Sequence, residues 1–115
     1  MHSLHLKVNN VNCTNNQQAI NRSFTLVEEL GLHVRNSVYH EFYPHGLTFT
    51  VILSESHMTI STWPEDRMVQ IDLFLCNSDS TNIFKKAIDQ AVSIFSATEF
   101  DYMILDRNMM CVMPL

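Results

Sequence analysis

Residues 47–63 read LTFTVILSESHMTISTW, and this stretch decides how the chain is expected to fold. Apolar and polar residues alternate from Leu47 to Leu53 and again from His57 to Thr62. A period of two is typical of strands that bury one face. Ser54-Glu55-Ser56 separates the two runs. We therefore expect two neighbouring strands joined by a short polar turn.

The same periodicities predict the elements on either side of this hairpin. Apolar residues recur at helical spacing over 17–30 and over 83–95, which predicts two helices. Alternating or β-rich runs predict further strands over 3–11, 33–43, 68–76 and 99–106. Gly31 is a natural stop for the first helix. Pro44-His45-Gly46 indicates a turn, and residues 77–81 offer N-cap candidates for the second helix.

The resulting order is β-α-β-β-β-β-α-β, which predicts an α+β fold. We expect a two-layer α/β sandwich: an antiparallel sheet with the helices on one face. The aliphatic faces of 47–53 and 68–76 should pack under the helices. The opposite face then holds a mixed set: Thr48, Ile52, Thr59, Ser61, Asp72, Phe74 and Cys76. Such a face suggests a second layer, a partner chain or a site.

Size and composition restrict the class of protein. A chain of 115 residues, 46% of them hydrophobic, predicts a single domain over 1–115. The net charge of −5 and the scattered basic residues argue against a nucleic-acid partner. No apolar run is long enough to span a membrane and no secretory signal begins the chain, so we expect a cytoplasmic protein. Three widely spaced cysteines and the dispersed histidines predict neither a disulfide framework nor a metal site.

Ser56 has no glycine-flanked motif of the kind that serine hydrolases use. A different chemistry uses a serine within its own chain. The hydroxyl attacks the carbonyl of Glu55, which turns the amide into an ester, and elimination across Cα–Cβ of the serine then cuts the chain. The new N-terminus becomes a pyruvoyl group. Its ketone forms a Schiff base with a substrate amine and accepts electrons when a carboxylate leaves.

Three motifs resemble the proenzymes of the bacterial S-adenosylmethionine decarboxylase family. Residues 54–65, SESHMTISTWPE, are similar to the family's Ser-Glu-Ser-His-(Leu/Ile)-(Thr/Ser)-Ile-His-Thr-Trp-Pro-Glu. Residues 72–76, DLFLC, match Asp-x-Phe-x-Cys, and residues 42–48, FYPHGLT, look like Phe-x-Pro-x-Gly-x-Ser. Length and element order agree too. The resemblance implies a zymogen that cleaves itself autocatalytically and decarboxylates S-adenosylmethionine for the synthesis of polyamines such as spermidine.

The resemblance also implies a role for individual residues. Ser56 would be the self-processing serine, with scission after Glu55, and Cys76 would be the proton donor after decarboxylation. On the substrate side, Phe42 would stack on the adenine ring and Glu65 would accept hydrogen bonds from the ribose, with Trp63 beside it. Without the motifs, Phe42 and Cys76 would be read as ordinary core residues and Glu65 as a turn carboxylate.

The chain departs from the family pattern at three places. Ser61 stands where the family has a histidine that helps the ester to break down, and a hydroxyl cannot carry protons as an imidazole does at neutral pH. Thr48 replaces a serine that supports the acyl shift; it keeps the hydroxyl and adds a methyl group. Asn9-Asn10 occupies a segment where the family usually carries an acidic residue. His57 adjoins Ser56, but neighbours on a strand point to opposite faces, so we do not assign it the missing role.

Three functions stay open on these grounds. The first is a self-processing S-adenosylmethionine decarboxylase. The second is an unprocessed homologue that binds an adenosyl ligand or regulates an active paralogue. The third is a related enzyme with another substrate, such as ornithine or arginine, or another reaction that consumes S-adenosylmethionine. The resemblance implies a homodimer whose two sheets face each other, with Ser56 and Cys76 of one chain meeting Thr48 and Ser61 of the other. A heteromer with a paralogue is the alternative.

Overall fold

The computed structural model describes residues 1–13, 15–76 and 80–115, which form one antiparallel sheet and two helices. The elements in chain order are β1 (His2–Asn9), α1 (Asn16–Glu29), β2 (Val34–Glu41), β3 (Leu47–Leu53), β4 (His57–Trp63), a 3-10 turn (Pro64–Asp66), β5 (Met68–Leu75), α2 (Ser80–Ile94), β6 (Glu99–Asp106) and β7 (Cys111–Met113). The strands lie side by side in the order β2-β3-β4-β5-β1-β6-β7.

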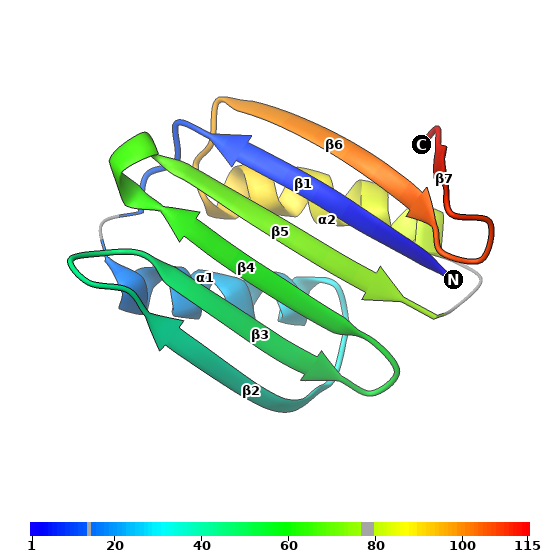
Figure 1. Cartoon of the computed structure of the whole chain (residues 1–115), viewed down its shortest axis with the longest axis horizontal. Coiled ribbons are helices and arrows are strands. Elements are labelled where there is room, and N and C mark those ends of the chain that lie inside the picture. Colours follow the sequence, from blue (N-terminus) through cyan, green and yellow to red (C-terminus); the bar gives the residue numbers. More distant parts are fainter. Residues whose placement is uncertain (14, 77–79) are drawn as a thin grey trace.

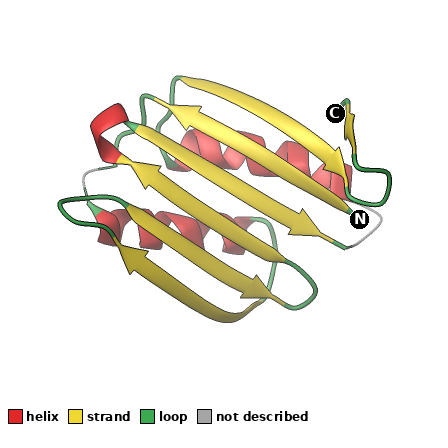
Figure 2. Cartoon of the chain, in the orientation of Figure 1, coloured by secondary structure: helices red, strands yellow, loops and turns green. Residues whose placement is uncertain are grey.

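Both helices pack against the same face of the sheet, as Figures 1 and 2 show. Apolar side chains fill the space between the two layers, because every second residue of β3 and β5 points towards the helices. Phe49 of β3, Phe84 of α2 and Phe95 after α2 are almost fully buried. Burial stabilises each side chain of this size by roughly 1.5–3 kcal/mol. The predicted α+β fold with helices on one face is confirmed.

The ends of α1 follow from its flanking residues. Asn15 is the N-cap, and its side-chain oxygen accepts a hydrogen bond from the backbone N–H of Gln18 at 2.9 Å. At the other end Gly31 has φ +68°, a conformation that costs glycine little. The N–H of Gly31 donates to Glu28 and that of Leu32 to Val27, which satisfies two of the last carbonyls. The predicted stop at Gly31 is therefore confirmed.

The sequence-based boundaries differ from the observed ones by at most three residues, the largest difference being at the start of α2, and one strand was missed. The missed strand is β7, which pairs with β6 at the edge of the sheet. It is only three residues long, which is too short to show a period of two. The turn before it is held by Asp106, whose carboxylate accepts backbone N–H bonds from Met109 and Asn108. Those bonds lower the pKa of Asp106.

Of the N-cap candidates for α2, residues 77–79 lie outside the described residues; Ser80 begins the helix.

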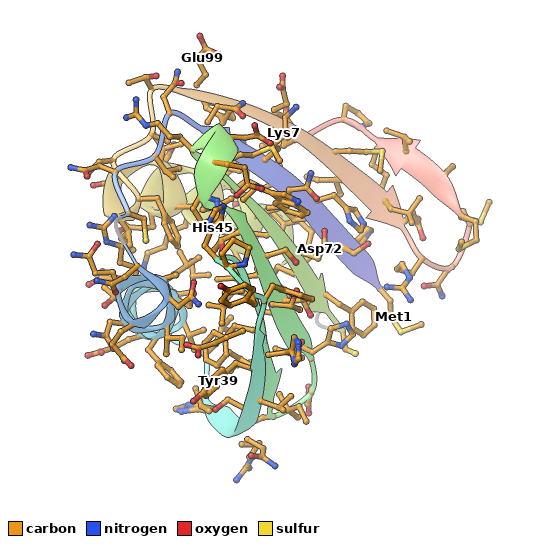
Figure 3. All side chains as sticks on the ribbon, turned by 60° about the vertical axis from the view of Figure 1, so that its left-hand side comes forward. Met1, Lys7, Tyr39, His45, Asp72 and Glu99 are labelled. Atoms are coloured by element: carbon orange, nitrogen blue, oxygen red, sulfur yellow. The ribbon has the colours of Figure 1, made fainter. Side chains whose placement is uncertain are left out.

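In the described part of the chain no helix covers the other face of the sheet (Figure 1), and this face is chemically mixed, as predicted. Hydroxyls of Thr50 and Thr59 contact each other at 3.1 Å, and the guanidinium of Arg107 lies 4.7 Å above the ring of Phe74. Figure 3 shows Asp72 on the side of the sheet away from α1. Apolar side chains lie among these groups: Ile52 is 46% exposed and Met103 is 41% exposed. This face is called the open face below.

Candidate active site

Ser56 lies in the turn between β3 and β4. The backbone N–H of Leu53 donates to the carbonyl of Ser56 at 2.9 Å, which closes the turn. Ser54 and Glu55 are exposed, whereas Ser56 is half-buried. These three residues line a small hollow of about 130 Å³ with the end of α1 and with His33. The Glu55–Ser56 peptide bond is therefore at the surface, in a segment whose ends are fixed by strands.

Cys76 lies at the same end of the sheet as Ser56. His57 and Phe74 are register partners on adjacent strands, and their rings lie 5.2 Å apart. Cys76 follows Phe74 by two residues, so it continues past β5 to the level of Glu55. Its side chain is exposed and forms no disulfide. We call Glu55, Ser56, His57 and Cys76 the serine cluster.

A second group of predicted residues surrounds a cavity of about 300 Å³ at the other end of β3 and β4. Thr48 and Ser61 are register partners there, so their side chains project from neighbouring strands on the open face. Phe42, from the turn before β3, closes one side, and its ring meets that of His40 at 4.7 Å. The set that lines the cavity is Phe42, His45, Gly46, Leu47, Thr48, Ser61, Thr62, Trp63 and Glu65. We call this space the threonine cavity.

A contact between a histidine and a carboxylate links two turns in the wall of the threonine cavity. Nε2 of His45 lies 2.8 Å from Oε2 of Glu65. His45 comes from the Pro44–Gly46 turn, and Glu65 from the 3-10 turn after β4. The first turn is held in place because the Gly46 carbonyl accepts from the N–H of Phe42 and from the side chain of Asn16. The sequence indicated only a turn at His45, so this pair was missed.

The serine cluster and the threonine cavity lie at opposite ends of the same strands. Ser56 precedes β4 and Ser61 lies near its end. Five residues of extended chain separate their Cα atoms by about 16 Å, at roughly 3.3 Å per residue. Within one chain, no group lining the threonine cavity can exchange a proton directly with Ser56, because direct transfer needs hydrogen-bond distance.

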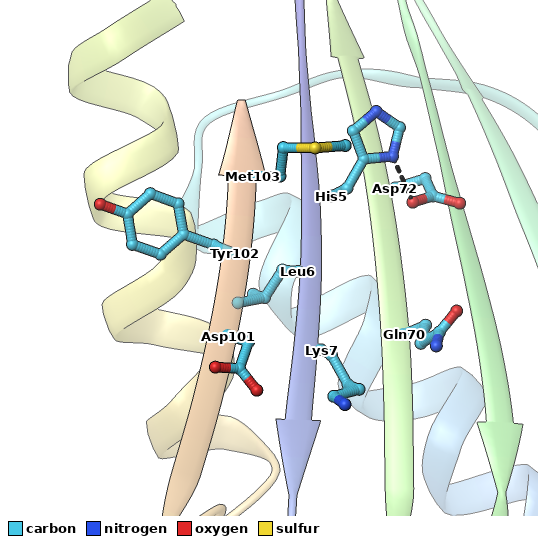
Figure 4. Close-up of a pocket in the computed structure, with 8 residues that line it drawn as sticks. All are labelled: His5, Leu6, Lys7, Gln70, Asp72, Asp101, Tyr102 and Met103. Carbon is cyan, nitrogen blue, oxygen red and sulfur yellow. Dashed lines mark hydrogen bonds and ion pairs between the residues drawn. The ribbon is translucent and has the colours of Figure 1, made fainter. Parts of the chain in front are cut away.

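A larger cavity, of about 370 Å³, lies on the open face away from both groups. It is lined by His5, Leu6, Lys7, Gln70, Asp72, Asp101, Tyr102 and Met103 (Figure 4). Nδ1 of His5 lies 2.9 Å from Asp72, and its Nε2 lies 3.0 Å from the hydroxyl of Ser3. Ser3 is almost completely buried, so this Ser-His-Asp chain does not present an accessible nucleophile. Of these residues the sequence analysis had placed only Asp72 on this face.

A family model described as S-adenosylmethionine decarboxylase matches residues 4–108. The chain belongs to the S-adenosylmethionine decarboxylase family. A protein from Archaeoglobus fulgidus named S-adenosylmethionine decarboxylase proenzyme is 37% identical over 83 residues, which is 72% of this chain and 72% of that protein. A protein of the same name from Persephonella marina is 33% identical over 82 residues, covering 71% of this chain and 60% of that protein.

The family fold also appears in the solved structures. The adenosylmethionine decarboxylase of Aquifex aeolicus superimposes with a TM-score of 0.80, at 23% identity, over 92% of this chain and 88% of that one. That likeness supports the fold alone. Among the described residues, no three His, Cys, Asp or Glu side chains gather as metal ligands would. No described helix is long and apolar enough to cross a membrane.

Proposed function

We propose that the chain is the proenzyme of a pyruvoyl-dependent S-adenosylmethionine decarboxylase that cuts itself between Glu55 and Ser56. The observation that carries this proposal is the position of Ser56: a half-buried serine in a fixed surface turn, with the Cys76 thiol exposed at the same end of the sheet. Family membership and the names of the relatives support the substrate. Three free cysteines fit a reducing, cytoplasmic setting.

The residues present fit a cofactor made from the chain itself. Ser56 supplies both the hydroxyl that attacks Glu55 and the carbon atoms of the pyruvoyl group. That group supplies an electron-accepting ketone for loss of a carboxylate. Cys76 donates the proton that replaces the lost carboxylate. Phe42 and Trp63 offer aromatic surface for an adenine ring, and Glu65 offers carboxylate oxygens to ribose hydroxyls.

This assignment requires two copies of the chain, because Ser56 and the threonine cavity lie at opposite ends of one protomer. In a two-fold dimer the same surface is used twice, so a contact from residue i to residue j recurs from j to i. Two open faces packed against each other would bring the serine cluster of each chain to the threonine cavity of its partner. The exposed Ile52 and Met103 on the open face favour such burial.

The experiment that tests self-processing is an intact-mass measurement of the purified chain. We expect two fragments, residues 1–55 and 56–115, and a faster split in hydroxylamine, which attacks esters. Ser56→Ala is the matched control and should stay whole. The split protein should then release carbon dioxide from S-adenosylmethionine rather than from ornithine or arginine. A chain that stays whole with and without hydroxylamine would show that the proposal is wrong.

Ser61 favours a second candidate, an unprocessed homologue that binds an adenosyl ligand or pairs with an active paralogue. A serine hydroxyl does not titrate near neutral pH, so the step that the family assigns to a histidine lacks its usual proton carrier. Under this candidate the wild-type chain stays whole, and Ser61→His restores the split. Binding of S-adenosylmethionine to the whole wild-type chain, measured by calorimetry, would distinguish a ligand-binding homologue from an inert one.

A further inference from the structure

We propose that His45 supplies the imidazole that position 61 lacks, and that it acts as the general base when the ester at Ser56 of the partner protomer breaks down. This inference rests on the proposed self-processing and on the two-fold dimer. It identifies a catalytic residue that neither the motif nor the family resemblance assigned. The carrying observation is that His45, Thr48 and Ser61 line the same cavity.

The surroundings of His45 are those of an oriented base. Its Nε2 contacts Oε2 of Glu65 at 2.8 Å. The negative charge of this carboxylate stabilises the imidazolium that forms when the histidine takes a proton. Among the described residues, no hydrogen bond to a ring nitrogen of His45 is present. A histidine with a free ring nitrogen and a carboxylate beside it suits a general base.

Access and rigidity support the same role. The side chains of His45 and Glu65 are each 50% exposed, so the pair is open to a group that approaches from outside the protomer. The turn that carries His45 is fixed by two hydrogen bonds to the Gly46 carbonyl. Among the described residues that line the threonine cavity, His45 carries the one imidazole.

The other histidines near reactive residues are less suitably placed than His45 to act as this base. His57 adjoins Ser56, but its ring lies against Phe74 and has no carboxylate partner among the described residues. His33 lines the hollow beside Ser56 without a hydrogen bond to orient it in the described structure. The pair His5–Asp72 has the same chemistry as His45–Glu65 but lies in the larger cavity, away from Thr48 and Ser61.

The step balances as follows. After the acyl shift, residue 56 holds a free amine and an ester bond from its side-chain oxygen to the Glu55 carbonyl. The imidazole of His45 takes the Cα proton of residue 56; the C–H electrons form a Cα=Cβ double bond, and the Cβ–O bond breaks. Glu55 leaves as a C-terminal carboxylate. The enamine left on residue 56 becomes an imine, and water releases ammonia to give the ketone.

The test is the rate of chain scission, followed by intact mass in wild type, His45→Gln and His5→Gln. General bases of this kind contribute 10²–10⁴-fold, so His45→Gln should slow the loss of the ester about 100-fold or more. Ester should accumulate, which hydroxylamine detects as a fast split. His5→Gln removes an equivalent ion pair from the other cavity and should split at the wild-type rate.

Two further readouts separate a base from a structural residue. Added imidazole should speed chain scission of the His45→Gly variant. In a chain that carries His45→Gln, the second change Ser61→His should restore the rate of scission. Scission of His45→Gln at the wild-type rate, or equal slowing by His5→Gln, overturns the assignment of His45 alone. A wild-type chain that never splits overturns self-processing and this inference together.

Discussion

Thr48 carries a methyl group where the family pattern has a serine, and it is the register partner of Ser61 on the neighbouring strand. A threonine holds its hydroxyl in fewer orientations than a serine, because two heavy atoms on Cβ restrict χ1. The added methyl group therefore fixes the hydroxyl and also narrows the threonine cavity. If the hydroxyl stabilises charge that develops during the acyl shift, the oxygen atom matters more than the methyl group.

Two substitutions at position 48 separate these contributions. Thr48→Val keeps the shape and removes the hydroxyl, and we expect it to slow scission about 100-fold, the size seen when one donor to a developing oxyanion is lost. Thr48→Ser keeps the hydroxyl and should change the rate by only a few fold. The measurement is intact mass against time. Equal rates of scission for Thr48→Val and wild type would show that the Thr48 hydroxyl takes no part in processing.

Individual site residues were readable from the sequence only where they belonged to a linear motif. Ser56, Ser61 and Glu65 fall in one run of twelve residues, and Cys76 directly follows the next strand. The partner of Glu65 was not readable, because His45 lies twenty positions earlier and meets it only through the approach of two turns. A histidine beside glycine in a turn carries no local signal of a base. Its chemistry depends on a distance that the fold sets.

At the scale of elements, periodicity predicted the sheet well because its strands bury one face. The alternation in β3 and β5 coincides with buried and exposed side chains residue by residue. The strand β2 was predicted from its β-branched and aromatic residues, although all of it is exposed at an edge of the sheet. The missed strand β7 shows the limit: three residues provide no period, and its existence depends on pairing with β6.

The end of α1 gives a stability prediction at this scale. Gly31 adopts φ +68°, and a Cβ there would meet no atom within 4 Å. The cost of Gly31→Ala is therefore conformational rather than steric, about 1–2 kcal/mol. We expect the melting temperature to fall by several degrees. Gly31→Asn should lower the melting temperature less than Gly31→Ala does, because asparagine tolerates this conformation better than alanine. If Gly31→Ala and wild type had the same melting temperature, the result would argue against the glycine cap.

At the scale of the whole molecule, the sheet itself prevents one protomer from completing the site. Ser56 directly precedes β4 and Ser61 lies near its other end, so the length of this extended strand keeps the serine cluster away from the threonine cavity. The mixed character of the open face was predictable from alternation in the sequence. Which residues would meet across that face was not, because the contact depends on a second copy and its symmetry.

Mixed dimers test whether the site is shared between two chains. Ser56→Ala removes the serine cluster's nucleophile, and Glu65→Gln damages the threonine cavity, so each homodimer should lose decarboxylation. In a mixed dimer, one site combines Ser56 of the Glu65→Gln chain with Glu65 of the Ser56→Ala chain and is intact. Co-expression should then give about a quarter of the wild-type rate, because roughly half of randomly paired dimers are mixed and each has one intact site of two. Light scattering should report a dimer. No recovery in the mixture, or a monomer in solution, would contradict the shared site, because a site within one chain cannot be rescued by a partner.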